Sequence, residues 1–118
     1  EVLGLPQQQR LFEWAHQRTG EVPLVLESDD VLANPEAMLR ALCRRAGIAF
    51  DPAMLSWPAG RRDSDGLWAA HWYGAVEKST GFMAPGEATR PVPAHLQDLL
   101  AAAQPYYQAL RPHRLVPD

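Results

Sequence analysis

The sequence has one cysteine, no long apolar run and no excess of basic residues among its 118 residues, and each shortage excludes a class of protein. Cys43 has no second cysteine to pair with, so an internal disulfide is excluded. No apolar run approaches the roughly 18–20 residues that span a bilayer, and no signal-peptide pattern is present, so we expect a cytoplasmic protein without a membrane partner. The net charge of −3 argues against a nucleic-acid partner, because such a surface needs clustered basic residues.

Sequence motifs that mark catalytic or metal sites are also missing. There is no Gly-x-x-x-x-Gly-Lys-Ser/Thr loop to cradle a phosphate, no Gly-x-Gly-x-x-Gly and no nucleophile elbow. Paired cysteines and His-x-x-x-His spacing are absent, so the sequence predicts no metal site. The catalytic residues therefore stay unknown at this level.

Composition and length set the size of the fold. Apolar residues make up 47% of the chain and charged residues 21%, which predicts a globular structure. A chain of 118 residues can form one small core, but it is short for a complete nucleotide-dependent transferase. We therefore expect these residues to be part of a longer protein.

The stretch 21–50 carries the strongest local signals. The apolar, β-branched run at 22–26 is followed by an acidic cluster and predicts one short strand. A helix is predicted over 35–46, because Asn34 can cap its first turn and apolar residues then recur every three or four positions. Gly47 is placed to end this helix in a left-handed cap.

Three further helices are predicted from apolar periodicity, over 5–19, 66–79 and 93–110. Pro105 lies inside the last of them, so we expect a kink or a break there. The fold class is therefore mainly α within this chain, with about four helices and one short strand. The apolar faces are predicted to bury Trp14, Leu39, Leu42, Trp68, Trp72, Val76, Leu96 and Leu100.

The order of these motifs resembles that of P-loop sulfotransferases. Ser28-Asp29-Asp30-Val31 stands where that family has tyrosine-glutamate-aspartate-leucine, and Asn34-Pro35 stands at its aspartate-proline. The resemblance covers most of residues 1–83, and its later part is similar to bacterial sulfotransferase-like proteins. The runs that carry this later part are 51–60, 65–68 and 71–82.

The resemblance implies a fold, a function and a partner. The chain would be the C-terminal portion of an α/β P-loop sulfotransferase-type fold, and the missing N-terminal P-loop portion would be its partner. The complete enzyme would transfer a sulfuryl group from 3′-phosphoadenosine 5′-phosphosulfate to a small hydroxyl or amine acceptor. This chain alone would be inactive and would bind no cofactor tightly. Residues 1–83 would be the C-terminal segment of the domain, 84–92 a linker, and 93–118 a docking helix and tail.

Sulfuryl transfer needs cations and hydrogen-bond donors around a spread negative charge, and aromatic side chains can wall an acceptor pocket. Each candidate has a structural alternative: a solvated loop for the arginines, a helix cap for the 78–80 run, and a packed core for the aromatic residues. The cofactor-binding candidates are Arg61, Arg62, Lys78, Ser79 and Thr80. The substrate-pocket candidates are Trp57, Trp68, His71, Trp72 and Tyr73.

Two other functions stay open at this level. The aromatic and leucine stripes could make the chain a non-catalytic helical module that binds a partner protein. The fold could also persist without activity, because the arginine-lysine-glycine loop of the sulfotransferases has no clean copy here. The sequence encoded before Glu1 would distinguish these alternatives, since a P-loop there would favour the enzyme.

Overall fold

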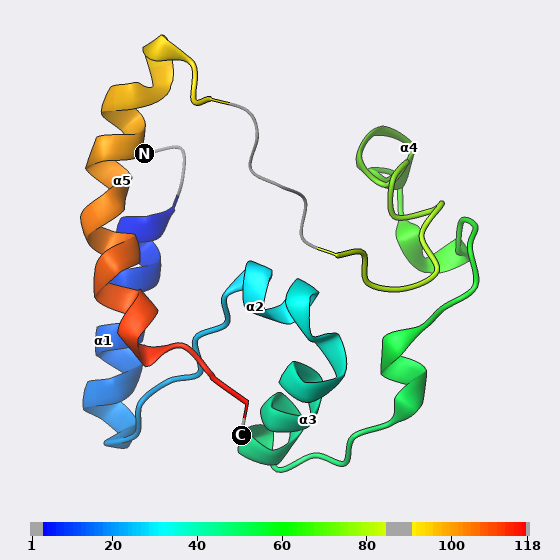
Figure 1. Ribbon diagram of the computed structural model, residues 1–118, viewed down its shortest axis with the longest axis horizontal. Coiled ribbons are helices and arrows are strands. Elements are labelled where there is room, and N and C mark those ends of the chain that lie inside the picture. The colour runs from blue at the N-terminus through cyan, green and yellow to red at the C-terminus, as the bar shows by residue number, and fades with distance from the viewer. Residues whose placement is uncertain (1–3, 85–90, 118) are drawn as a thin grey trace. The chain divides into compact units, whose positions relative to one another are not determined.

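The computed structural model describes residues 4–84 and 91–117, and this part of the chain is mainly helical (Figure 1). The described residues divide into two compact units. The terminal unit joins residues 4–28 to 91–116, and the central unit contains 29–84. The predicted linker at 84–92 lies mostly outside the described residues. No described helix is both long enough and apolar enough to cross a membrane.

Two helices from opposite ends of the chain form the terminal unit. Helix α1 spans Leu5–Thr19 and helix α5 spans Gln97–Leu110, and the two pack against each other. Short 3-10 turns at Ala94–Leu96 and Arg111–His113 flank α5. Both helices were predicted, and of the two alternatives at Pro105, a kink or a break, the break is wrong. Proline removes only one intrahelical hydrogen bond, and α5 continues through it.

The predicted strand at 22–26 does not form among the described residues. The segment is extended, but its one ladder contact is an isolated parallel bridge between Val25 and Arg114. The backbone N–H of Leu115 donates to the carbonyl of Val25 at 2.8 Å. A strand needs a neighbouring strand along its length, and only this short contact is available here.

The central unit begins with two consecutive helices. Helix α2 spans Ser28–Ala33 and was not predicted; its first turn carries acidic residues at the positive end of the helix dipole. Helix α3 spans Pro35–Ala46, as predicted. It ends at Gly47, whose φ of 69° is the left-handed conformation that glycine adopts without strain.

The predicted helix over 66–79 is wrong for most of its length, because only α4, Ala69–Trp72, is α-helical. After α4, the carbonyl oxygens of Glu77 and Thr80 accept hydrogen bonds from the backbone of residues 60 and 57. The end of the predicted helix therefore pairs with a segment about 20 residues earlier in the chain. Apolar spacing alone could not show this pairing.

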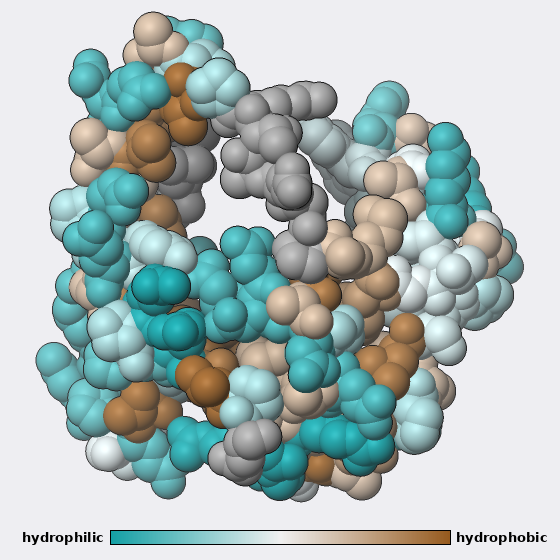
Figure 2. Space-filling model, viewed as in Figure 1, coloured by the Kyte–Doolittle hydropathy of each residue, from teal (hydrophilic) through white to brown (hydrophobic). Residues whose placement is uncertain are grey.

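The predicted core is also wrong in part. Leu39 and Leu42 are half-buried, but the other six predicted core residues are exposed. The exposed fractions are Trp14 58%, Trp68 73%, Trp72 74%, Val76 56%, Leu96 37% and Leu100 39%. Figure 2 shows apolar side chains at the visible surface among polar ones. The apolar faces predicted from the sequence therefore exceed what the described residues can cover.

The fully buried apolar residues are few among those described, and three of the four are small. They lie on α3 and at the start of α4, and they are Met38, Ala41, Cys43 and Ala69. The thiol of Cys43 lies 3.9 Å from the sulfur of Met54, so the cysteine packs as an apolar residue in this core.

Candidate functional site

The candidate site is a closed loop, residues 57–80, in the central unit. Two backbone hydrogen bonds join its ends: the N–H of Trp57 donates to Thr80 O at 3.0 Å, and that of Gly60 donates to Glu77 O at 2.7 Å. The arms of the loop are therefore paired at its base. All ten residues that the sequence predicts for cofactor or substrate contact lie on this loop.

The base of the closed loop is tightly packed at Gly81. An isolated antiparallel bridge joins Ser56 to Gly81. A Cβ atom added at position 81 would lie 3.1 Å from the carbonyl oxygen of Leu55, which is closer than most van der Waals contacts. Glycine therefore permits the close approach of the two arms at this point.

A side-chain hydrogen bond also joins the two arms. The indole Nε1 of Trp57 donates to Ser79 Oγ at 2.9 Å, and Ser79 Oγ donates to the carbonyl of Val76 at 2.7 Å. The Trp57 ring makes an edge contact with Phe82, with ring centroids 5.5 Å apart. A serine hydroxyl has one proton, and this one is donated to Val76. The structure thus places Trp57 and Ser79 in the base of the loop, in contact with each other.

The cationic candidates lie just beyond this base. Arg61 follows Gly60 and Lys78 follows Glu77, so the pairing of Gly60 with Glu77 brings the two basic segments to the same end of the loop. The side chains of Arg61, Arg62 and Lys78 are exposed, and within the described residues none of them forms an ion pair. Their charge is therefore available to a ligand.

The backbone beside the two arginines is fixed by a carboxylate. The N–H of Arg62 donates to Asp65 Oδ2 at 2.8 Å across a short 3-10 turn, Asp63–Asp65. Gly66 follows with a φ of 68° and leads the chain into α4. The consecutive residues Asp65 and Gly66 are a turn signal in the sequence, and this signal indicates that the backbone beside the arginines is ordered.

The remaining aromatic candidates lie in and around α4, and this part of the loop is called its head. Trp68 and Trp72 stand four residues apart across the helical turn of α4, so they share one face. His71 and Tyr73 are exposed beside them, as is Thr80 at the base. The loop therefore carries the basic candidates near its base and the exposed aromatic candidates on its head, while Trp57 and Ser79 bind each other in its base.

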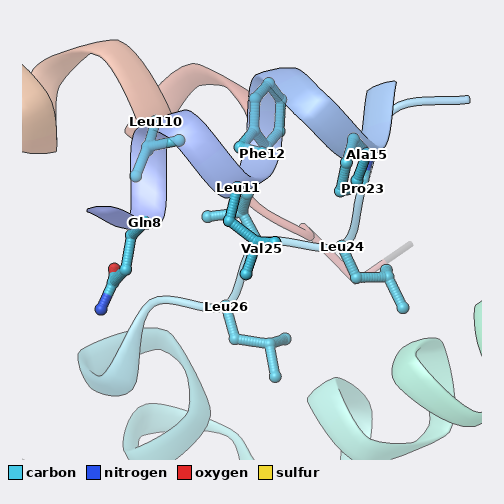
Figure 3. A pocket seen from close by; sticks show the side chains of 9 residues that line it. All are labelled: Gln8, Leu11, Phe12, Ala15, Pro23, Leu24, Val25, Leu26 and Leu110. Carbon is cyan, nitrogen blue, oxygen red and sulfur yellow. The ribbon is translucent and has the colours of Figure 1, made fainter. Parts of the chain in front are cut away.

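An apolar groove in the terminal unit was not predicted. Its volume is about 470 Å³, and it is formed by α1, the extended segment 23–26 and Leu110 (Figure 3). Leu110, from the other end of the chain, also lines the groove. Sequence spacing could not predict that Leu110 lies near residues 8–26. The lining residues are Gln8, Leu11, Phe12, Ala15, Pro23, Leu24, Val25, Leu26 and Leu110.

A second contact in the terminal unit involves titratable groups. Tyr107 Oη on α5 donates to Glu27 Oε2 at 2.7 Å. This hydrogen bond raises the pKa of the Tyr107 phenol, with smaller contributions from desolvation and from the negative charge of Glu27, while Arg111 opposes the shift. Among the described residues, no group of three or more His, Cys, Asp or Glu side chains could hold a metal ion.

Comparison with known proteins defines the family. The family model described as a sulfotransferase domain matches residues 11–114, so the chain belongs to the sulfotransferase domain family. The sulfotransferase resemblance of the sequence is thereby confirmed at the level of the family. The match extends through α5, the helix that pairs with α1 in the terminal unit.

Two curated plant proteins are similar to the chain. They are the branched-chain-amino-acid aminotransferase-like proteins 1 and 2 of Arabidopsis thaliana, each 42% identical over 94 residues. These residues are 80% of this chain and 17% of each plant protein, so the chain spans only a small part of the relatives it matches. No solved structure matches the chain significantly.

Proposed function

We propose that these residues form the C-terminal part of a sulfotransferase domain that transfers a sulfuryl group from 3′-phosphoadenosine 5′-phosphosulfate to a small hydroxyl or amine acceptor. The observation that carries this proposal is the closed loop, which carries three cations near its base and exposed aromatic side chains on its head, the cations forming no ion pair among the described residues. Membership of the sulfotransferase domain family supports the same reaction class.

The basic end of the loop fits part of such a donor. Arg61 and Arg62 offer planar, fork-shaped donors that match phosphate or sulfate oxygens, and Lys78 offers a compact positive charge. Thr80 is exposed nearby with a hydroxyl group. When bound, the donor supplies the sulfuryl group, and these residues would hold its anionic oxygens and neutralise their charge.

The other part of the donor needs groups that these residues do not encode. A cradle of backbone N–H groups for the 5′-phosphosulfate would require a Gly-x-x-x-x-Gly-Lys-Ser/Thr loop, and the 118 residues contain none. We therefore propose that a P-loop portion outside these residues completes the site and belongs to the same α/β fold.

The extended segment 23–26 supports the need for such a portion. The side chains of Leu24 and Leu26 point away from α1 (Figure 3), with exposed fractions of 41% and 46%. Their backbone groups make no hydrogen bond within the described part of the chain, although the carbonyl of Val25 between them binds Leu115. An open strand edge with an uncovered apolar face suits pairing with another extended segment. We propose that a strand of the P-loop portion pairs there.

The names of the plant relatives suggest another reaction, aminotransfer. The match covers 17% of each plant protein, and the sulfotransferase domain family matches residues 11–114 of this chain. We therefore propose no aminotransferase activity for these residues. A helical interaction module remains the alternative, and the experiment below separates it from the enzyme.

The test is to change Arg61, Arg62 and Lys78 singly to alanine in the complete protein and to measure turnover of the sulfuryl donor. Loss of one charge-assisted hydrogen bond should cost about 1.5–3 kcal/mol, or roughly ten- to a hundredfold in donor affinity or turnover. Arg61→Lys or Arg62→Lys should not restore the rate if that arginine makes a bidentate contact, because a point charge does not reproduce the planar fork.

Thermal stability of each variant checks that the fold is intact. Arg10→Ala is the matched control, because Arg10 is an exposed arginine on α1 in the terminal unit. If the three loop variants stay folded and turn over within twofold of the parent, the cations of the loop are ordinary surface charges. A complete protein that neither binds nor consumes the donor would instead favour the interaction module.

A further inference from the structure

The hydrogen bonds at the base of the closed loop use every hydrogen-bonding group of the Trp57 and Ser79 side chains except one acceptor lone pair. The indole N–H of Trp57 binds Ser79 Oγ, and the hydroxyl proton of Ser79 binds Val76 O. Neither side chain has a proton left to donate to an anion. Any effect of these residues on ligand binding must therefore act through the shape of the loop.

The bond between the two side chains spans 22 residues of the chain and lies next to the cations. Between it and the head of the loop is the backbone pair Gly60–Glu77, and Arg61 and Lys78 are the residues that follow the members of that pair. If the arms separated at Trp57 and Ser79, the two basic segments would no longer be held at one place. Binding an anion would then have to order the loop, which costs affinity.

The ring of Trp57 is held by a second contact that does not depend on its N–H. Its edge-on packing against Phe82, with centroids 5.5 Å apart, is available equally to a phenylalanine at position 57. Replacing the tryptophan by phenylalanine therefore separates the hydrogen bond from the aromatic packing.

We infer that Trp57 and Ser79 are positioning residues, which latch the closed loop so that Arg61, Arg62 and Lys78 meet one anionic group of the sulfuryl donor. This inference rests on the proposed function. It reassigns Trp57 from the acceptor pocket and Ser79 from direct contact with the cofactor. The anionic ligand is recognised by the arginines and the lysine, and the latch reinforces the backbone pairing that sets their spacing.

The experiment measures the affinity of the complete protein for 3′-phosphoadenosine 5′-phosphate by calorimetry. Trp57→Phe and Ser79→Ala should each weaken binding roughly tenfold, about the effect of one hydrogen bond. The double variant should lose no more than the weaker-binding single variant, because both changes break the same bond. Ser79→Thr keeps the hydroxyl and should bind within twofold of the parent, while Trp14→Phe on α1 is the matched control for loss of an indole.

A spectroscopic readout shows whether the latch is broken without unfolding. The indole N–H resonance of Trp57, assigned by its disappearance in Trp57→Phe, should shift in Ser79→Ala and keep its position in Ser79→Thr. If the resonance shifts as expected while affinity stays within twofold, the residues do not position the cations and the inference is wrong. If the parent protein itself does not bind the nucleotide, the proposed function is wrong, and the inference that rests on it is wrong too.

Discussion

At the scale of single residues, Tyr107 joins segments that are 80 residues apart in the chain. Its phenol on α5 donates to Glu27, which lies just before α2. The hydrogen bond favours the protonated phenol, so the pKa of Tyr107 is raised, and this bond is the largest cause of the shift. The contact therefore makes part of the stability of the terminal unit dependent on pH.

The direction of this dependence follows from the raised pKa. A phenol with a higher pKa in the folded state contributes stability that is fully present below its unfolded pKa of about 10 and is lost as the pH rises through the folded value. Ultraviolet titration of the folded protein should show one tyrosine that ionises later than the others. Tyr107→Phe should remove that component.

Two further variants test the cause of this shift. Glu27→Gln removes the charge and should move the late titration toward the ordinary tyrosine range. Tyr106→Phe, which changes the neighbouring tyrosine on α5, should leave the late component in place. A late component that survives in Tyr107→Phe would show that another group is responsible.

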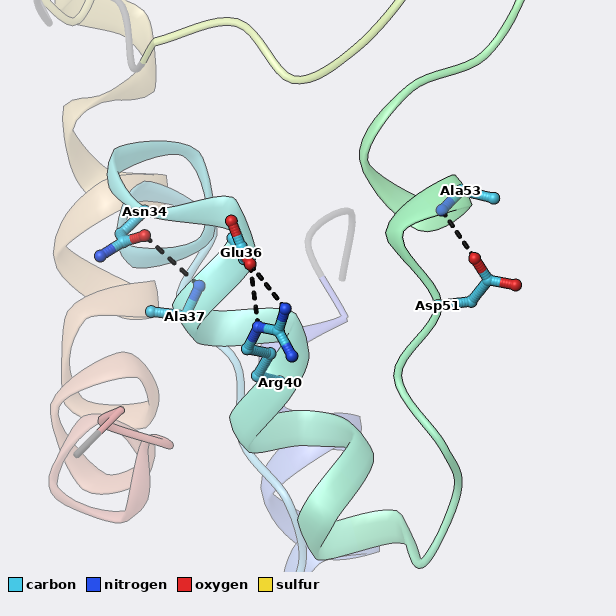
Figure 4. Close-up of polar contacts among 6 residues, drawn as sticks. All are labelled: Asn34, Glu36, Ala37, Arg40, Asp51 and Ala53. Atoms are coloured by element: carbon cyan, nitrogen blue, oxygen red, sulfur yellow. Dashed lines mark hydrogen bonds and ion pairs between the residues drawn. The ribbon is translucent and has the colours of Figure 1, made fainter.

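At the scale of elements, α3 is a helix whose two ends are both marked in the sequence. Asn34 Oδ1 accepts from the N–H of Ala37 at 3.3 Å, and Glu36 and Arg40 form an ion pair at 2.8 Å one turn apart (Figure 4). Arg40 also lies over the ring of Phe50 at 4.0 Å. These signals are local, so the sequence could predict the bounds of α3 correctly.

Asn34→Ala should destabilise the central unit, because it removes the side-chain acceptor for the first turn of α3. The expected cost in free energy of unfolding is about 1 kcal/mol, the usual value for an N-terminal cap. Urea denaturation followed by circular dichroism measures it. Asn34→Asp is the matched control, since it retains an oxygen at the cap and adds a favourable charge at the helix N-terminus. Equal stability of the alanine variant and the parent would show that this cap contributes nothing.

The elements that the sequence did not predict depend on distant segments. The 66–79 stretch has helical spacing, but the carbonyl of Glu77 near its end binds Gly60 on the arm that begins at Trp57. The 22–26 stretch has the composition of a strand, but its edge is paired only near Val25. Composition shows that the candidate loop is basic and aromatic, and the binding role of its residues stays a prediction. Composition could not show that Trp57 and Ser79 bind each other, because they lie 22 residues apart.

At the scale of the whole molecule, the order of motifs predicted the sulfotransferase relationship more reliably than periodicity predicted burial. The family match covers residues 11–114, whereas Trp68 and Trp72 are exposed although their spacing suggests a core. Apolar spacing indicates which face of a helix can pack against another segment, but it does not identify that segment or place it within this chain. Under the proposed function, part of the cover lies outside these 118 residues.

The 118 residues alone should not bind 3′-phosphoadenosine 5′-phosphate tightly. The cations of the loop can meet its phosphates, but the backbone cradle for the 5′-phosphate is not encoded here. Isothermal titration calorimetry of the isolated chain should therefore give a dissociation constant weaker than micromolar. A micromolar or tighter value would show that the loop suffices without a P-loop portion.

The terminal unit pairs the first helix of the chain with its last, and this matters while the protein is being made. Helix α1 leaves the ribosome long before α5, because synthesis proceeds at roughly 5–20 residues per second. Until Leu110 has emerged, the groove beside Leu11 and Phe12 lacks one of its walls. The nascent chain therefore carries the apolar face of α1 without α5 against it for several seconds, and a message truncated before α5 would yield a product suited to capture by chaperones and proteases rather than to folding.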